Sequence, residues 1–392
     1  MKICFVCNEY PPAPHGGIGT FVRTLAVRLV SLDHEVFVVG FDPGCEAQRW
    51  TEDQGVRVLH IPVLKRPRWT LRFGRWNLDA GIVSGRRRLS EVVGTVVRDR
   101  AVDIVESYDW SGPLWSPPSR PLVVRLHGAN TAFSVYEGKR PSVVLRFLER
   151  RNVAFANALV AVSRHIGGTT LAALGLPGRQ FTVIPNGVDL EVFRPAPVKR
   201  DPLEVLYVGG ITRRKGIPDL MAAAQEVLRS VDDVHFKLIG HLPENGQREA
   251  LLEGLLSEVP ARWHGRFEFV GRVPHAELPR HYSRAALVVV PSRAEAFGLT
   301  CVEAMACGAP VVMTSLASGP ELVEHGRTGL LANPTDSGEF AASIIQLLRS
   351  ESLRRDIGSA ARSWVSEKLD INGLTTRNLE FYQEVIERHG RC

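Results

Sequence analysis

Two glutamates near residue 300 stand where side chains can bind the hydroxyls of a phosphorylated sugar. Glu295 and Glu303 are separated by seven residues, and Gly298 between them opens a helix after the apolar run 287–290. The free N–H groups at a helix start attract phosphate, and a glycine there lets the ligand come close. Carboxylates would repel that phosphate, so we expect them to bind a sugar and a ribose on either side of a diphosphate. The competing interpretation is a solvated loop glutamate and a charge that the helix dipole favours.

A basic loop supplies cations for the same chemistry. Arg213, Arg214 and Lys215 follow the apolar run 205–208. When the bond between an anomeric carbon and a diphosphate breaks, negative charge grows on the departing phosphate, and a fixed cation stabilises it. The alternative is a solvated basic loop. The sequence has no Asp-x-Asp motif and no His/Cys ligand set, so we predict that the chemistry requires no metal.

In the first half of the chain, a histidine also ends a strand-like segment and a pair of glycines follows one. His127 ends the strand-like segment 122–127, at the carboxyl end where open α/β sheets place their ligands. A purely structural hydrogen-bonding role is the alternative for this histidine. Gly16 and Gly17 begin a helix after the first strand-like segment, but Val22 stands where the dinucleotide fingerprint requires a third glycine. This departure disfavours an NAD-dependent dehydrogenase.

Short apolar runs alternate with helical periodicity along the whole chain, which is the pattern of parallel sheets covered by helices. Each half begins with a strand, a glycine loop and a helix, so the predicted fold class is α/β with two doubly wound sheets. We expect strands at 2–7, 35–39, 56–61, 104–107, 122–127, 158–163, 205–208, 235–239, 267–270, 287–290 and 311–313. Later helices are expected at 142–160, 218–229, 247–264, 275–284, 336–349, 352–367 and 372–388.

The composition is that of a globular protein, with 44% hydrophobic and 23% charged residues. No charged start precedes an apolar segment as in a signal peptide, and no apolar run reaches membrane-spanning length. We therefore expect a cytoplasmic protein. Cys4 and Cys7 lie three apart on a strand and so point to opposite faces, where we expect them to be buried and reduced rather than to bind metal.

Much of the net charge of +6 lies in residues 65–100, which hold ten Lys or Arg against three acidic residues. Trp69, Phe73 and Trp76 lie among them. Such a surface can meet a membrane, an anionic acceptor or a lipid-linked pyrophosphate, which would place the protein peripherally at the inner membrane face. The competing interpretation is a solvated helix face with aromatic residues packed inward. No nucleic-acid-binding motif accompanies the charge, so we expect no nucleic acid partner.

The stretch 295–312 (EAFGLTCVEAMACGAPVV) resembles the E-x7-E signature of retaining glycosyltransferases of family 4. IPNGVD at 184–189 and PELVEHGRTGLLAN at 320–333 are also similar to sequences of that family. The resemblance implies the GT-B fold, with two Rossmann-like domains that face each other across a cleft and a C-terminal helix that crosses back to the first domain. We place an acceptor-side domain at 1–193, a Pro-rich linker at 194–202, a nucleotide-sugar-binding domain at 203–371 and the returning helix at 372–392.

The resemblance also implies roles for individual residues around the donor. Gly16 and Gly17 match the glycines that approach the diphosphate and the transferred sugar, and His127 matches a histidine that contacts the donor sugar. The signature residues that would contact the donor are Glu295, Phe297, Gly298, Leu299 and Glu303.

The basic loop matches the family's pattern only in part. Lys215 matches the lysine that binds the diphosphate, whereas Gly210 stands where the family has an arginine. Arg213 and Arg214 are both candidate replacements. Val273, in the loop after the strand at 267–270, would hold the base through backbone groups, so uracil, guanine and adenine all remain open.

The implied function is a retaining, metal-independent glycosyltransferase of class EC 2.4 that needs no cofactor beyond its donor, a UDP-, GDP- or other nucleoside-diphosphate sugar. His127, Lys215 and Glu295 are the expected catalytic residues. The first half shows no convincing carboxylate pair for a double displacement, so we expect the acceptor hydroxyl to attack from the leaving-group side. The acceptor would belong to a glycan, glycolipid or secondary metabolite. The rival functions are a pseudo-glycosyltransferase and a catalytically silent nucleotide-sugar-binding subunit.

Overall fold

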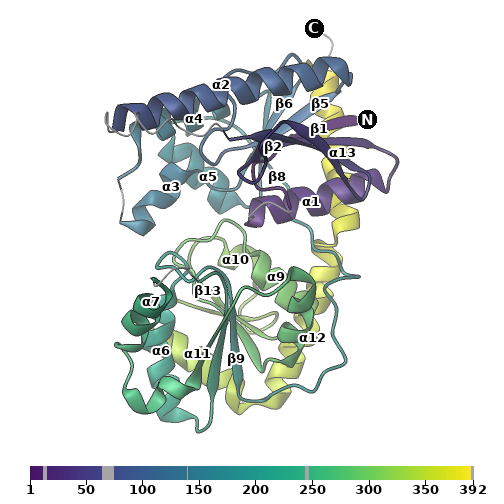
Figure 1. Ribbon diagram of the computed structural model, residues 1–392. Helices are drawn as coiled ribbons and strands as arrows, with labels where there is room; N and C mark the ends of the chain where they lie inside the picture. The colour runs from purple at the N-terminus through teal and green to yellow at the C-terminus, as the bar shows by residue number, and fades with distance from the viewer. Residues whose placement is uncertain (12–15, 64–74, 139, 243–246, 390–392) are drawn as a thin grey trace. The chain divides into compact units, whose positions relative to one another are not determined.

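The computed structural model describes residues 1–11, 16–63, 75–138, 140–242 and 247–389, with residues 75–80 described by their backbone alone. The chain divides into two compact units, whose elements are labelled in Figure 1. Unit 1 consists of Met1–Gly187 together with Ile371–Cys392, and unit 2 consists of Val188–Asp370.

Unit 1 is built on an eight-stranded sheet in the order β3-β4-β2-β1-β5-β6-β7-β8. All neighbouring pairs are parallel except β3 with β4. The strand order reverses between β1 and β5, which is the switch point at which doubly wound sheets bind ligands. The strands are β1 (Lys2–Val6), β2 (Glu35–Asp42), β3 (Arg49–Asp53), β4 (Val56–Pro62), β5 (Ile104–Tyr108), β6 (Leu122–Leu126), β7 (Ala158–Ala161) and β8 (Thr182–Val183).

The last helix of the chain belongs to unit 1, although it follows unit 2 in sequence. This helix, α13 (Ile371–His389), packs against α1 (Gly17–Val30), and the yellow and purple ribbons cross each other in Figure 1. The expectation that the C-terminal helix returns to the first half is therefore confirmed. The other helices of unit 1 are α2 (Arg75–Asp99), α3 (Asn130–Ser134), the 3₁₀ turn η2 (Val135–Glu137), α4 (Val143–Ala154) and α5 (Arg164–Ala173).

A fully buried ion pair fastens α13 to the sheet. The Arg125 guanidinium on β6 donates to both carboxylate oxygens of Glu106 on β5, at 2.7 and 3.1 Å. Arg125 also donates to Asn378 Oδ1 on α13 at 2.5 Å, and Tyr382 of α13 donates to Glu106 at 2.5 Å. Two strands and a helix remote in sequence thus satisfy one buried charge pair, as burial requires.

Unit 2 is built on a parallel sheet in the order β11-β10-β9-β12-β13-β14. Its strand order reverses between β9 and β12. The strands are β9 (Glu204–Val208), β10 (His235–Ile239), β11 (Phe267–Gly271), β12 (Leu287–Val290), β13 (Val311–Thr314) and β14 (Leu330–Ala332). The helices are α6 (Ile217–Ser230), α7 (Gln247–Leu256), η3 (Ala261–Arg266), η4 (His275–Glu277), α8 (Leu278–Arg284), α9 (Leu299–Ala306), α10 (Gly319–Leu322), α11 (Ser337–Arg349) and α12 (Glu351–Lys368).

The two doubly wound sheets confirm the predicted fold class, but several element bounds were wrong. The helix expected over 247–264 ends at Leu256, because Pro260 interrupts the backbone hydrogen bonds and a 3₁₀ segment follows. The helix expected over 142–160 ends at Ala154. The sequence also missed β3 and β14. The first is an exposed polar edge strand without an apolar run, and the second is only three residues long.

The expected burial of Cys4 and Cys7 is confirmed. Cys4 and Cys7 are buried and unpaired, and burial raises the pKa of both thiols to about 12. A thiol with such a pKa stays protonated near neutral pH and acts as a small apolar side chain.

The basic segment 65–100 is described only in its second part. Residues 64–74, with Trp69 and Phe73, lie outside the described residues, as does the side chain of Trp76. On α2, Arg87 lies over the Trp115 ring at 4.7 Å, and Arg88 donates to the Pro62 carbonyl at 3.0 Å. Membrane contact through this segment stays a prediction. Among the helices that the structure describes, none has the length and apolar character to cross a bilayer.

Candidate functional site

The basic loop and the Glu295 loop of unit 2 meet at the switch point of the sheet. They follow β9 and β12, which are hydrogen-bonded neighbours. The Arg214 carbonyl accepts hydrogen bonds from the N–H groups of Arg293 and Ala294, at 3.0 and 3.4 Å. Gly216 makes this approach possible, because a Cβ there would lie 1.8 Å from the Pro291 carbonyl oxygen and its φ is +74°.

This docking brings two of the predicted catalytic residues into contact. Lys215 Nζ donates to Glu295 Oε2 at 2.6 Å, and Ser292 Oγ donates to the same oxygen at 3.0 Å. Burial alone would raise the pKa of Glu295, but the Lys215 ammonium, Arg214 and the Ser292 hydroxyl more than offset it. The pKa of Glu295 therefore lies below its ordinary value, and the side chain is a carboxylate at neutral pH.

The start of α9 lies directly after this pair. Gly298 is the N-cap residue with φ +104°, and no side chain caps the helix. The first N–H groups of α9 therefore carry the positive end of the helix dipole without a side-chain acceptor at the cap. Ser318 Oγ donates to the carbonyls of Glu295 and Phe297 at 3.1 and 3.0 Å, which fixes the loop before the helix. Phe297 is buried and Leu299 is half-buried.

Glu303, the second signature glutamate, has two partners that sequence reasoning missed. His275 Nε2 lies 2.8 Å from Glu303 Oε1, and the Tyr282 hydroxyl donates to Oε2 at 2.9 Å. His275 follows the half-buried Val273 by two residues in the loop after β11, and its ring lies against Phe193 with centroids 5.0 Å apart. The available signal was the position of a histidine after a strand, at the edge where ligands bind.

The predicted residues of unit 1 lie around the carboxyl ends of β1 and β6. Gly16 caps α1, and its N–H donates to Glu9 at 3.1 Å, while Gly17 is the first residue of α1. The backbone N–H groups of His127 and Gly128 donate to the two carboxylate oxygens of Asp109, both at 2.9 Å. The ring of Phe21 on α1 lies 5.3 Å from the His127 ring, so His127 lies close to the helix that Gly16 and Gly17 begin.

His127 is held as a neutral imidazole. Its side chain is buried, and burial, together with the nearby Arg125 charge, lowers the pKa of His127 to about 3 from an ordinary 6.5. Such a ring can donate a hydrogen bond at one nitrogen and accept at the other, but it carries no charge at neutral pH.

This shift predicts a pH dependence of stability. Between pH 6.5 and about 3 the unfolded chain binds a proton at His127 that the folded chain does not, so the free energy of unfolding should fall as the pH drops. Relative to a His127→Gln variant, the wild type should lose at most about 1.4 kcal/mol per pH unit in this window. Urea denaturation of both proteins at pH 7.5 and pH 5 checks this. If the free energy of unfolding depends on pH in the same way in both proteins, folding does not lower the pKa of His127.

The predicted residues thus form two sets. Unit 2 contains Lys215, Glu295, Phe297, Gly298, Leu299, Glu303 and Val273, and unit 1 contains Gly16, Gly17 and His127. Arg213 is exposed, and Arg214 is half-buried with its backbone engaged at the loop contact. Gly210, at the position of the expected arginine, accepts a hydrogen bond from the Tyr207 hydroxyl at 2.8 Å through its carbonyl.

Comparison with known sequences finds two family matches that follow one another along the chain. Residues 15–192 match the family described as Glycosyltransferase Family 4, and residues 190–364 match Glycosyl transferases group 1. D-inositol 3-phosphate glycosyltransferase 1 of Catenulispora acidiphila is 33% identical over 319 residues, which cover 75% of this chain and 73% of that protein. A glycogen synthase of Mycobacterium tuberculosis is 28% identical and covers 97% of this chain and 94% of its own length.

Solved structures agree on the fold. A sucrose-phosphate synthase of Thermosynechococcus elongatus superposes with a TM-score of 0.80 at 21% identity, over 99% of this chain and all of that one. HepE of Anabaena, solved in complex with UDP-glucose, superposes with a TM-score of 0.70 at 19% identity, over 98% of this chain and all of that one.

Proposed function

We propose that this chain, which belongs to glycosyltransferase family 4 and moves a sugar from a nucleotide sugar, transfers glucose from UDP-glucose to an acceptor hydroxyl with retention of the anomeric configuration. The contact between Lys215 and Glu295 at the switch point of unit 2, beside the start of α9, carries the assignment of the transfer step. The likeness to HepE of Anabaena, solved with UDP-glucose, supports the choice of donor.

The two electrostatic elements of that site suit a departing diphosphate. Lys215 has three N–H donors, so its ammonium can bind a phosphate oxygen while it keeps Glu295. The uncapped N–H groups of α9 supply a second, fixed source of positive potential. A cation and aligned dipoles stabilise the charge that grows on the leaving group, so we assign no metal to this step.

The carboxylates are assigned to hydroxyl groups. Glu295, ionised and fixed by Lys215 and Ser292, would accept hydrogen bonds from the transferred sugar. Glu303, fixed by His275 and Tyr282, would accept from the ribose. Val273 would hold the uracil through backbone groups, and the neutral His127 would donate to the sugar.

Retention follows from attack on the same face as the departing diphosphate. In this step the acceptor oxygen bonds to the anomeric carbon, the bond to the diphosphate breaks, and the departing phosphate takes the acceptor's proton. Attack from the leaving-group side requires no protein nucleophile, so Glu295, whose Oε2 accepts from Lys215 and Ser292, is assigned an electrostatic role. The protein would then contribute position and electrostatics. We assign the acceptor to the first domain, in which Gly16 and Gly17 would approach the diphosphate and the transferred sugar.

A panel of donors tests the proposal. UDP-glucose at a hundred times its dissociation constant should add about 2.7 kcal/mol to the free energy of unfolding, seen as a rise in Tm. GDP-, ADP- and dTDP-glucose at the same concentration should add less. With water in place of the acceptor, only UDP-glucose should be hydrolysed by the protein, to free glucose and UDP. A Tm that responds equally to all four sugars would contradict the donor assignment. A large shift with no release of UDP would favour a catalytically silent binding subunit.

A further inference from the structure

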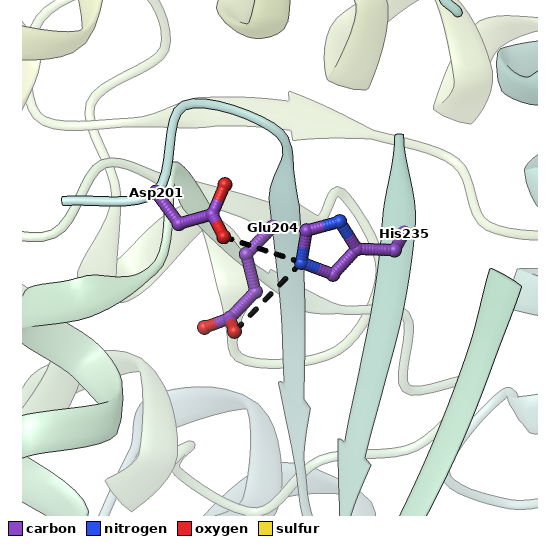
Figure 2. Close-up of side chains that lie close together, drawn as sticks. All are labelled: Asp201, Glu204 and His235. Carbon is purple, nitrogen blue, oxygen red and sulfur yellow. Dashed lines mark ion pairs between the residues drawn. The ribbon is translucent and has the colours of Figure 1, made fainter. Parts of the chain in front are cut away.

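Three metal-ligand side chains meet at the edge of unit 2 that is opposite to the Lys215 loop. Asp201 precedes β9, Glu204 is the first residue of β9, and His235 is the first residue of β10. Glu204 and His235 are direct partners in the parallel register of these strands. The two side chains therefore project from rigid neighbouring positions, and Figure 2 shows them converging with Asp201.

The spacing of the donor atoms suits a small divalent cation. His235 Nε2 lies 3.5 Å from Asp201 Oδ2 and 3.9 Å from Glu204 Oε2, and the three donor atoms all lie within 4.8 Å of one another (Figure 2). Zinc bonds of about 2.0–2.1 Å place neighbouring atoms of a tetrahedral site about 3.3–3.4 Å apart. The two pairs that involve His235 are close to this spacing, and contraction of the cluster would complete three corners of such a site.

The backbone around the cluster is already fixed. Asp201 Oδ1 accepts the Leu203 N–H at 3.1 Å, which leaves Oδ2 on the side of the imidazole. The Asp201 N–H donates to the Arg284 carbonyl at 2.7 Å, and the His235 N–H donates to the Leu203 carbonyl at 3.1 Å. A cation would consequently find ligands on ordered backbone rather than on a free loop.

The charges in the cluster are incompletely compensated. Glu204 is 1% exposed, and its Oε1 has no hydrogen-bond partner within the described part of the chain. Arg284 is the nearest guanidinium, but it lies 3.4 Å from Glu204 and 3.6 Å from Asp201, beyond the roughly 2.7–2.9 Å of a charge-assisted hydrogen bond. Its side chain is 53% exposed. Lys237 pairs with Glu268 at 3.2 Å, and its charge also acts on Glu204. Two cations therefore act on the cluster, but neither forms a hydrogen bond with Glu204 Oε1.

We propose that Asp201, Glu204 and His235 bind one divalent cation of the zinc class. One imidazole nitrogen and two carboxylates are ligands that zinc accepts, whereas magnesium and calcium prefer oxygen alone. Water fills the remaining position, and the exposed Arg284 swings toward solvent. The metal joins the segment before β9 to β10 and, through Asp201, to the end of α8. It lies at the amino edge of the sheet, so it supports the fold and takes no part in sugar transfer.

Titration of the full-length, chelator-treated protein with Zn²⁺ tests this site. Calorimetry should show one tight equivalent and a raised Tm, and Co²⁺ in its place should give the intense visible absorption of tetrahedral coordination. His235→Gln and Asp201→Asn should each weaken Zn²⁺ binding at least about tenfold. His264→Gln, which changes another half-buried histidine of unit 2, should leave the affinity as it is. Arg284→Gln should strengthen binding, because it removes a cation that competes for Asp201 and Glu204.

Arg284→Gln is expected to raise the affinity for Zn²⁺, whereas the ligand variants are expected to lower it. The test therefore remains decisive even if a ligand variant folds poorly. The site is refuted if the affinity for Zn²⁺ is the same in His235→Gln, or if Arg284→Gln weakens binding. Thiolate charge-transfer bands with Co²⁺ would likewise assign the metal to cysteines. Release of UDP from UDP-glucose should be equal with chelator and with Zn²⁺. The test of zinc binding can therefore fail without affecting the proposed transferase activity.

Discussion

Lys215→Ala should lower the kcat for UDP-glucose turnover by about 10²–10³, the usual effect of removing one preorganised donor from a developing anion. The ammonium contributes most when charge has moved onto the leaving phosphate, so the loss should appear mainly in kcat and less in KM. The measurement is the steady-state release of UDP, with Tm recorded for each protein.

The variant needs a control because Lys215 also forms an ion pair with Glu295. Lys237→Ala removes a comparable pair, with Glu268 at 3.2 Å, from the same unit but from outside the loops of the site. This control should retain the kcat of the wild type. If Lys215→Ala keeps kcat within about threefold of the wild type while the protein is folded, Lys215 does not face the leaving group and the proposed chemistry is wrong.

Arg125→Leu should destabilise the protein by about 3–5 kcal/mol, because Glu106 would remain buried without its charged partner. Asn378 would also lose the donor that links α13 to β6. We therefore expect α13 to become a site of early proteolysis. Chemical denaturation followed by circular dichroism measures the first effect, and limited trypsin digestion measures the second.

Two further variants distinguish the effect of leaving a buried charge unpaired from the effect of removing any arginine. Arg125→Leu combined with Glu106→Leu should recover much of the lost stability, since no unpaired charge then stays buried. Arg57→Ala, which breaks a 3.5 Å pair between two exposed side chains, Arg57 and Glu35, of the same sheet, should change the free energy of unfolding by less than about 1 kcal/mol. If Arg57→Ala and Arg125→Leu lowered the free energy of unfolding by similar amounts, burial would not explain the destabilisation by Arg125→Leu.

The local pattern of the chain already determined most of the elements and half of the site. Parallel strands buried on both faces read as apolar runs, so β9, β12 and β13 were visible directly in the sequence. Gly298 and Pro310 bracket α9 by backbone preferences that depend on nearest neighbours alone. Glu295 and Glu303 were identified because their spacing lies within one such local unit.

Tertiary structure decided which remote residues complete each charged group. Arg125 lies within the apolar run LVVRL, and nothing near it in sequence foretells Glu106 or a helix more than 240 residues later. Tyr282 reaches Glu303 because α8 packs against α9, and His275 reaches it from the turn η4 that leads into α8. Asp201, Glu204 and His235 meet because β10 lies beside β9. A sequence fixes periodicity, which is short-range, whereas the partner of a buried charge depends on the strand order and on helix packing, which only the folded chain establishes.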